Sequence, residues 1–133
     1  VETFAAAKSV IAIPEHLYYY RLARPGQDVS ADDERLYVHF DIFKYLNESI
    51  AMQKNTFLTD NLQMCKIQTH LYALRKIKNE FKDYYIKHAK QDLDSTGTFE
   101  RIYILARERI GQENADYYKA IELENVAAFR EYK

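Results

Sequence analysis

The chain has 133 residues, which is enough for one domain, and its 47% hydrophobic and 29% charged residues are typical of a globular protein. A formal net charge of −1 argues against a general role on nucleic acid or on an anionic membrane surface. One cysteine, Cys65, excludes an intramolecular disulfide, and no apolar run is long enough to span a bilayer. The single cysteine also suggests a reducing compartment, and no signal peptide is visible. Because the chain begins with Val1 and not Met, we expect a fragment of a longer protein.

The first part of the chain is predicted to be extended. Residues 10–13 form a short β-branched run before Pro14, and residues 15–22 form a second candidate strand. A loop follows over residues 24–29, where Pro25 and Gly26 break regular structure. Ser30 is placed to cap a helix predicted over residues 31–53, and the acids that follow it suit the positive end of the helix dipole.

The next helix is predicted to be long, over residues 57–90. Its apolar stripe consists of Ile67, Leu71, Leu74, Ile77 and Phe81. Because the later helices are about half as long, we expect part of this stripe, or its tyrosine flank, to stay exposed unless the first helix, another domain or a second copy covers it. We therefore expect the helical part to dock on another domain of its own protein or to self-associate. The opposite positions carry basic residues that we interpret as a solvated face, with binding of an anionic polymer or lipid as the alternative: Lys66, Arg75, Lys76, Lys78, Lys82 and Lys87.

Two shorter helices complete the prediction, over residues 98–110 and 113–131. Gly111 lies where a left-handed residue would end the first of them, and Thr98 lies where it can cap the start. The predicted fold class is therefore mainly α, with a short N-terminal extended segment followed by about four helices.

Arg21 and Arg24 lie at the end of the aromatic run, beside the Pro25-Gly26 break. A pair of surface arginines is the common origin of this pattern, and a grip on a diphosphate is the alternative. The residues around them resemble a known family. The segments FAAAKSVIAIPEHLYYYR, RPGQDVS, DER and HFDIFKYL are similar to the C-terminal end of the catalytic domain of family-2 glycosyltransferases with the GT-A fold, those of the capsule and teichoic-acid type above all.

This resemblance covers about residues 1–46 and implies both domains and a function. Residues 1–29 would end a GT-A-like catalytic domain, and residues 30–133 would form a helical extension. The parent enzyme would transfer a sugar from a nucleotide-sugar to a polysaccharide or cell-surface glycan, in the cytoplasm or on the cytoplasmic face of the membrane. In that family the loop after the last strand closes over the donor diphosphate, which assigns donor binding to Arg21, Arg24, Gln27 and His39.

No catalytic residue is assigned within the chain. The catalytic base and the acids that hold a divalent metal, Mg or Mn, are expected upstream, so the fragment alone should be inactive. The alternative function is a free-standing helical module for interaction or oligomerisation.

Other candidates have simpler explanations. No two of the four histidines lie three or four residues apart, so a metal site is not assigned. His39 is expected to satisfy a local hydrogen bond, and Cys65 to be a buried small hydrophobe. The tyrosine pairs at 84–85 and 117–118 are interpreted as core and helix contacts, with stacking on a sugar as the alternative.

Overall fold

The computed structural model describes residues 7–9, 11, 14, 31–51, 55–94 and 98–130, and they are mainly helical, as predicted. In this part of the chain the α-helices are α2 (Val38–Ala51), α3 (Thr56–Lys76), α4 (Asn79–Asp94), α5 (Phe99–Ile110) and α6 (Gln112–Glu122). Two 3-10 helices, η2 (Glu34–Tyr37) and η3 (Val126–Phe129), flank them. The predicted N-terminal strands lie outside the described residues, apart from single positions.

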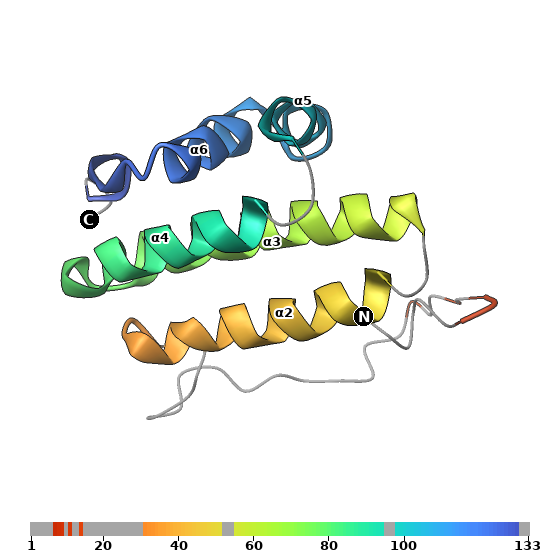
Figure 1. Ribbon diagram of the computed structural model, residues 1–133, viewed down its shortest axis with the longest axis horizontal. Coiled ribbons are helices and arrows are strands. Elements are labelled where there is room, and N and C mark those ends of the chain that lie inside the picture. The colour runs from red at the N-terminus through yellow and green to blue at the C-terminus, as the bar shows by residue number, and fades with distance from the viewer. Residues whose placement is uncertain are drawn as a thin grey trace.

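The helices form three layers, with α3 and α4 in the middle (Figure 1). α2 contacts both of them on one side, and α6 contacts both on the other. α5 is seen end-on in Figure 1, so it runs across the other helices, and it contacts α3 and α6. Because α3 is covered from both sides, polar as well as apolar residues of α3 are buried, among them Gln63, Lys66 and His70.

The chain enters the bundle through a short buried anchor that ends in η2. Ala31 and Leu36 are buried, and the Asp33 side chain caps η2 by accepting a hydrogen bond from the backbone N–H of Arg35 at 3.1 Å. The helix predicted over residues 31–53 therefore begins later, at η2, and becomes α-helical only at Val38. Ser30, the predicted cap, lies outside the described residues, and Asp33 has the capping role observed in the structure.

The long helix predicted over residues 57–90 is wrong, because the chain turns back at Ile77 and Lys78. Ile77 has extended backbone geometry (ψ 141°), and the N–H of Lys78 donates to the carbonyl of Asp32 at 2.8 Å. Neither glycine nor proline marks this turn. The apolar spacing continues across it because Ile77 and Phe81 both pack on the core, one before and one after the turn.

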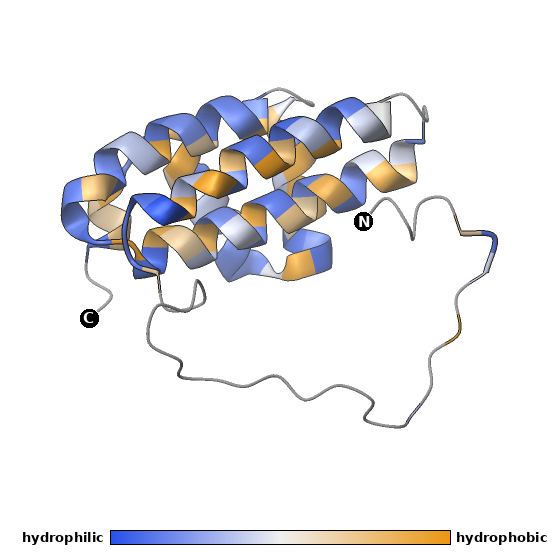
Figure 2. Ribbon diagram, turned by 90° about the horizontal axis from the view of Figure 1, so that it is seen from below, coloured by the Kyte–Doolittle hydropathy of each residue, from blue (hydrophilic) through white to orange (hydrophobic). Residues whose placement is uncertain are grey.

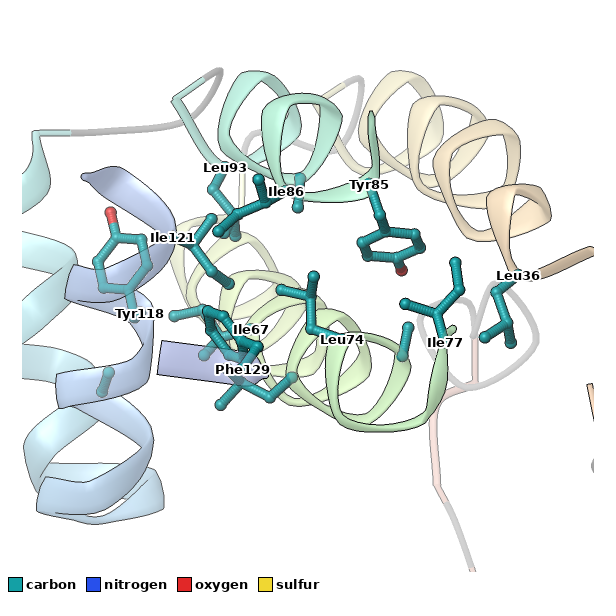
Figure 3. Close-up of a cluster of buried hydrophobic side chains, with 14 of the residues drawn as sticks. Leu36, Ile67, Leu74, Ile77, Tyr85, Ile86, Leu93, Tyr118, Ile121 and Phe129 are labelled. Atoms are coloured by element: carbon teal, nitrogen blue, oxygen red, sulfur yellow. The ribbon is translucent and has the colours of Figure 1, made fainter. Parts of the chain in front are cut away.

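The turn also closes the core. Figure 3 shows side chains from all three layers meeting around Ile67 and Leu74, with Tyr118 at one end of the cluster and Leu36 at the other. The first four residues of the predicted stripe, Ile67 to Ile77, are at most 2% exposed. The chain itself therefore covers these four positions, and the expectation that they stay exposed is wrong, whereas Tyr84 on the tyrosine flank is 50% exposed. Apolar and polar residues recur along each helix ribbon, as expected for amphipathic helices with one apolar and one polar face (Figure 2).

Gly111 joins α5 to α6 in a conformation that only glycine adopts readily. Its φ is 92°, as expected for a glycine at this junction, but its ψ of 159° is extended and not left-handed helical as predicted. Thr98 takes the N-cap position of α5 without a side-chain capping hydrogen bond.

The last predicted helix, over residues 113–131, ends early at Glu122. The N–H of Asn125 donates to the carbonyl of Ala120, and the N–H of Glu124 to that of Ile121, which is the Schellman pattern of a helix end. Glu124 occupies the left-handed position (φ 49°) where glycine is usual. No glycine marks this end, and the buried Phe129 of η3 continues the apolar spacing. The sequence therefore predicted a helix that extends through η3.

We therefore predict that Glu124→Gly stabilises the fold by about 0.5–1 kcal/mol. A residue with a Cβ atom is strained in the left-handed conformation, and glycine is not. The ion pair that is lost, Glu124 with Lys90 at 3.8 Å, lies at the surface and contributes little. Urea denaturation of the 133-residue chain measures the change. Leu123→Gly is the control, since Leu123 has a negative φ and glycine there should not stabilise; equal gains in both variants would contradict the explanation.

Candidate functional site

Of the four residues assigned to donor binding, only His39 lies in the described part of the chain. Arg21, Arg24 and Gln27 fall outside it. His39 lies on α2, half-buried, beside a surface depression that Ala31, Arg35 and Val38 also line. Its Nδ1 lies 3.0 Å from the hydroxyl of Tyr85, so the Nδ1 edge of the ring points into the bundle.

The most concentrated chemistry in the described residues is a buried polar network around Asp92, at the end of α4. Lys66 and His70, one turn apart on α3, contact opposite oxygens of its carboxylate. The Nζ of Lys66 lies 2.7 Å from Oδ1, and the Nε2 of His70 lies 2.9 Å from Oδ2. The Nζ of Lys66 also donates to the backbone carbonyl of Asp92 at 3.1 Å. We call Asp92, Lys66, His70, Tyr85 and His39 the Asp92 network.

Lys66 is the least expected member, because its side chain is completely buried. The sequence prediction placed it on a solvated lysine face, and for Lys66 this is wrong. Lys82 is also buried, with its Nζ donating to the backbone carbonyl of Phe129. The remaining surface of the Lys66 ammonium faces the ring of Phe43, whose centroid is 5.8 Å away. A buried ammonium with these partners is satisfied and not available to an external polymer.

The hydrogen-bond directions in the network follow from the carboxylate, which only accepts. Neutral His70 must donate from Nε2 to Asp92, so its Nδ1 is an acceptor and receives the hydroxyl proton of Tyr85 at 3.0 Å. The Tyr85 oxygen is then free to accept from Nδ1–H of His39. One chain of hydrogen bonds thus links α2, α4 and α3, with a defined tautomer for each ring.

Burial shapes the acid–base properties of the network. It lowers the pKa of His70 below the usual value, although Asp92 opposes the change, and it lowers the pKa of His39. Burial raises the pKa of Asp92, but hydrogen bonds from His70 and Lys66 outweigh it and hold the value below the usual range. Burial also raises the pKa of the Tyr85 hydroxyl. The network therefore holds one ion pair and neutral rings near neutral pH.

Above the network, α2 and α4 form a shallow open groove of about 360 Å³. We call it the α2/α4 groove; α2 contributes Phe40, Lys44, Asn47 and Glu48, and α4 contributes His88, Gln91 and Asp92. Asp92 connects the two, since its side chain is 11% exposed at the floor of the groove while both oxygens bond inward. The arrangement suits binding better than acid–base chemistry, because the groups with altered pKa values are engaged with one another below the surface.

Sequence reasoning did not find the Asp92 network, although two spacings could have indicated it. Lys66 and His70 are four residues apart and share one face of α3, and Tyr85 and Asp92 are seven apart and share one face of α4. The missing information was the turn at Ile77, which folds these two faces together.

Other predicted features are resolved by the structure. Cys65 is exposed and not buried as predicted, because it lies on the outer face of α3 with Asn61 and Gln68. Tyr85 and Tyr118 are core residues as predicted, but Tyr84 is 50% exposed.

Among the described residues, no group of three or more His, Cys, Asp or Glu side chains is arranged to hold a metal ion. None of the helices in the same residues has the length and apolarity needed to cross a membrane.

Because His39 and His70 are buried in the neutral form, we predict that the fold loses stability in mild acid. The unfolded chain takes up protons on these rings near a pKa of about 6.5, so the free energy of unfolding falls as the pH is lowered from about 7.5 to about 5.5. The loss due to Asp92 comes only in stronger acid. His39→Gln should make the slope of stability against pH shallower in this window.

Denaturant titrations of the chain and of His39→Gln at several pH values measure the two slopes. Glu122, whose pKa is raised by burial and by Asp94, contributes with the opposite sign in both proteins, so the difference between slopes isolates His39. Identical slopes would mean that His39 is not held neutral by the fold.

Comparison with known proteins finds no matching family model, no significantly similar curated protein and no significantly similar solved structure. The function is therefore inferred from the residues of this chain alone.

Proposed function

We propose that the chain is the C-terminal portion of a nucleotide-sugar-dependent glycosyltransferase of the GT-A type. Residues 1–29 would end its catalytic domain, and residues 30–133 would form its helical extension. The enzyme would transfer a sugar, with inversion, to a polysaccharide or cell-surface glycan, working in the cytoplasm or at the cytoplasmic face of the membrane. The observation that carries the proposal is the YYYRLARPGQ segment, residues 18–27, which comes shortly before Ala31 in the sequence.

The bundle supports this role by fixing the chain at Ala31 and Asp32, a few residues after that segment. Ala31 is only 2% exposed, and the backbone carbonyl of Asp32 accepts a hydrogen bond from Lys78 at the α3–α4 turn. The carboxylate of Asp32 also pairs with the Lys78 ammonium at 3.4 Å. A loop that must place Arg21 and Arg24 over a diphosphate benefits from a rigid attachment at one end, because less conformational freedom is then lost on binding.

In the proposed enzyme the two guanidinium groups would offset negative charge on the departing nucleoside diphosphate. Gln27 belongs to the same loop. His39 would face the loop with the edge of its ring that does not contact Tyr85. The divalent metal of such a reaction has no fitting ligand group among the described residues, and its ligands would lie in the upstream part of the parent enzyme.

A free-standing interaction module is the second candidate, and the outer face of α2 favours it. Val38, Ile42 and Tyr45 lie along one side of this helix at spacings of four and three residues, and they are 51%, 46% and 57% exposed. A row of exposed apolar side chains is suited to contact with another surface. In the glycosyltransferase proposal that surface is the catalytic domain; in the alternative it is a second copy or a separate partner.

We predict that Arg21→Ala and Arg24→Ala, made in the full-length parent, each reduce sugar transfer or nucleotide-diphosphate affinity by about tenfold to a hundredfold, as expected for one charge-assisted contact. Radiolabelled sugar transfer and titration with the nucleoside diphosphate measure the two effects. Arg107→Ala is the matched control, because Arg107 is an exposed arginine on α5, which contacts α3 and α6 on the side of the bundle away from α2.

Thermal melts should be unchanged in all three variants. If both loop variants keep full activity and nucleotide affinity, the arginines are ordinary surface residues, and the interaction module becomes the better explanation of the chain.

A further inference from the structure

The outer face of α2 carries the longest row of exposed apolar side chains in the described residues. Val38, Ile42 and Tyr45, which we call the α2 row, follow one another at spacings of four and three residues and so share one side of the helix. α2 is the outer layer on its side of the bundle, and none of the other described helices covers the row (Figure 1). The remaining exposed apolar side chains of the described helices, such as Phe57 and Ile104, occur singly, which is ordinary for a protein surface.

All three charged residues of α2 lie along one flank of this row. Asp41, Lys44 and Glu48 recur at spacings of three and four residues on the side of the helix toward α4, where Lys44 and Glu48 line the α2/α4 groove. Asp41 and Lys44 are exposed, and neither forms an ion pair within the part of the chain that the structure describes. The opposite flank of α2 carries no charge. The surface is therefore an apolar row with an acid and a base beside its centre.

A surface of this kind is complementary to a second copy of itself in antiparallel orientation. A two-fold axis perpendicular to α2 at Ile42 would place Ile42 against its own copy, and Val38 against Tyr45 of the second copy, since positions 38 and 45 lie on either side of position 42 at similar distances. The same axis brings equal flanks together, so Asp41 of each chain would face Lys44 of the other. In a parallel pair the charged flank would meet the uncharged one, and these two side chains would gain no partner.

We propose that the α2 row is the contact surface of a two-fold symmetric, antiparallel dimer of this chain. Of the occupants considered above, the charges favour a second copy over a catalytic domain or a separate partner, because the surface is complementary to itself. One helix from each chain makes a small contact, so the dimer is weak and depends on protein concentration. The inference does not rest on the proposed sugar transfer. In a glycosyltransferase with this dimer, the catalytic domain would contact another face of the bundle.

Sedimentation velocity of the 133-residue chain over a series of concentrations measures the dimer. The average sedimentation coefficient should rise with concentration. Ile42→Asp should weaken dimerisation at least about tenfold, because it places two carboxylates opposite each other within an apolar contact. Ile104→Asp is the matched control, since Ile104 is similarly exposed (48%) but lies on α5, and it should leave dimerisation unchanged. Both positions are at the surface, so thermal melts should show that both variants are folded.

Exchange of the charges tests the antiparallel register. Asp41→Lys alone and Lys44→Asp alone each bring only like charges together across the two-fold axis, so each variant should dimerise more weakly than the natural chain. An equimolar mixture of the two variants should dimerise again, because each heterodimer regains two pairs of opposite charge. The variant that carries both changes should also dimerise. A control mixture of Asp41→Lys with Ile42→Asp should not recover.

Three results would overturn the proposal: a natural chain that stays monomeric at the concentrations used for NMR spectroscopy, a dimer that Ile42→Asp leaves intact, or a mixture of the two charge variants that dimerises no better than each alone. The assay contains no nucleotide-sugar and requires no transfer. A monomeric chain would therefore refute the dimer and leave the proposed sugar transfer standing, whereas loss of the proposed role of Arg21 and Arg24 would leave the dimer standing.

Discussion

The carboxylate of Asp92 accepts hydrogen bonds from Lys66 and His70 on α3, and through this contact the two middle helices of the bundle are aligned. A buried charge is tolerated only when it is paired and hydrogen-bonded, so a slip of α3 along α4 would leave an ammonium and a carboxylate without partners. The hydrophobic core is less selective, because apolar side chains can repack. We infer that the Asp92 network specifies this register and that the surrounding apolar contacts supply most of the stability.

The same network connects the interior with the α2/α4 groove and with the buried anchor at Ala31. Tyr85 carries the hydrogen bonding from His70 to His39, so α2 is joined to the α3–α4 pair by a polar contact as well as by packing. With both neighbours fixed, the α2/α4 groove has a defined shape, and the anchor at Ala31 has a rigid base. In the proposed glycosyltransferase, a helical bundle built in this way would hold the end of the donor-binding loop in place.

The periodicity of apolar residues predicted the helical class, most helix positions and the identity of the main core residues, since burial of one face is a local pattern. It failed where the chain turns without glycine or proline. Ile77 and Lys78 turn because the Asp32 carbonyl and the core hold them there, and Glu124 ends α6 in a conformation that residue type does not indicate. These are tertiary effects, which a local pattern does not contain.

The candidate site was less accessible from sequence for the same reason. Lys66 was assigned to solvent because lysine is rarely buried, and the partner that makes its burial possible, Asp92, lies 26 residues away. Once α3 and α4 are known to fold back on each other, the matching faces of Lys66 with His70 and of Tyr85 with Asp92 become apparent. The sequence had raised stacking on the tyrosine pairs only as an alternative; the half-exposed Tyr84 and its ring contacts with Tyr37 and His88 are evident only in the structure.

A double-mutant cycle on Lys66 and Asp92 tests most directly whether the network organises the bundle. Lys66→Met or Asp92→Asn alone should cost about 3–5 kcal/mol of unfolding free energy, because each leaves a buried charge unpaired. The double variant, which buries no charge and keeps an acceptor for His70, should be more stable than either single variant, with a coupling of at least about 2 kcal/mol. Single variants that each cost less than about 1 kcal/mol and simply add in the double variant would contradict the account.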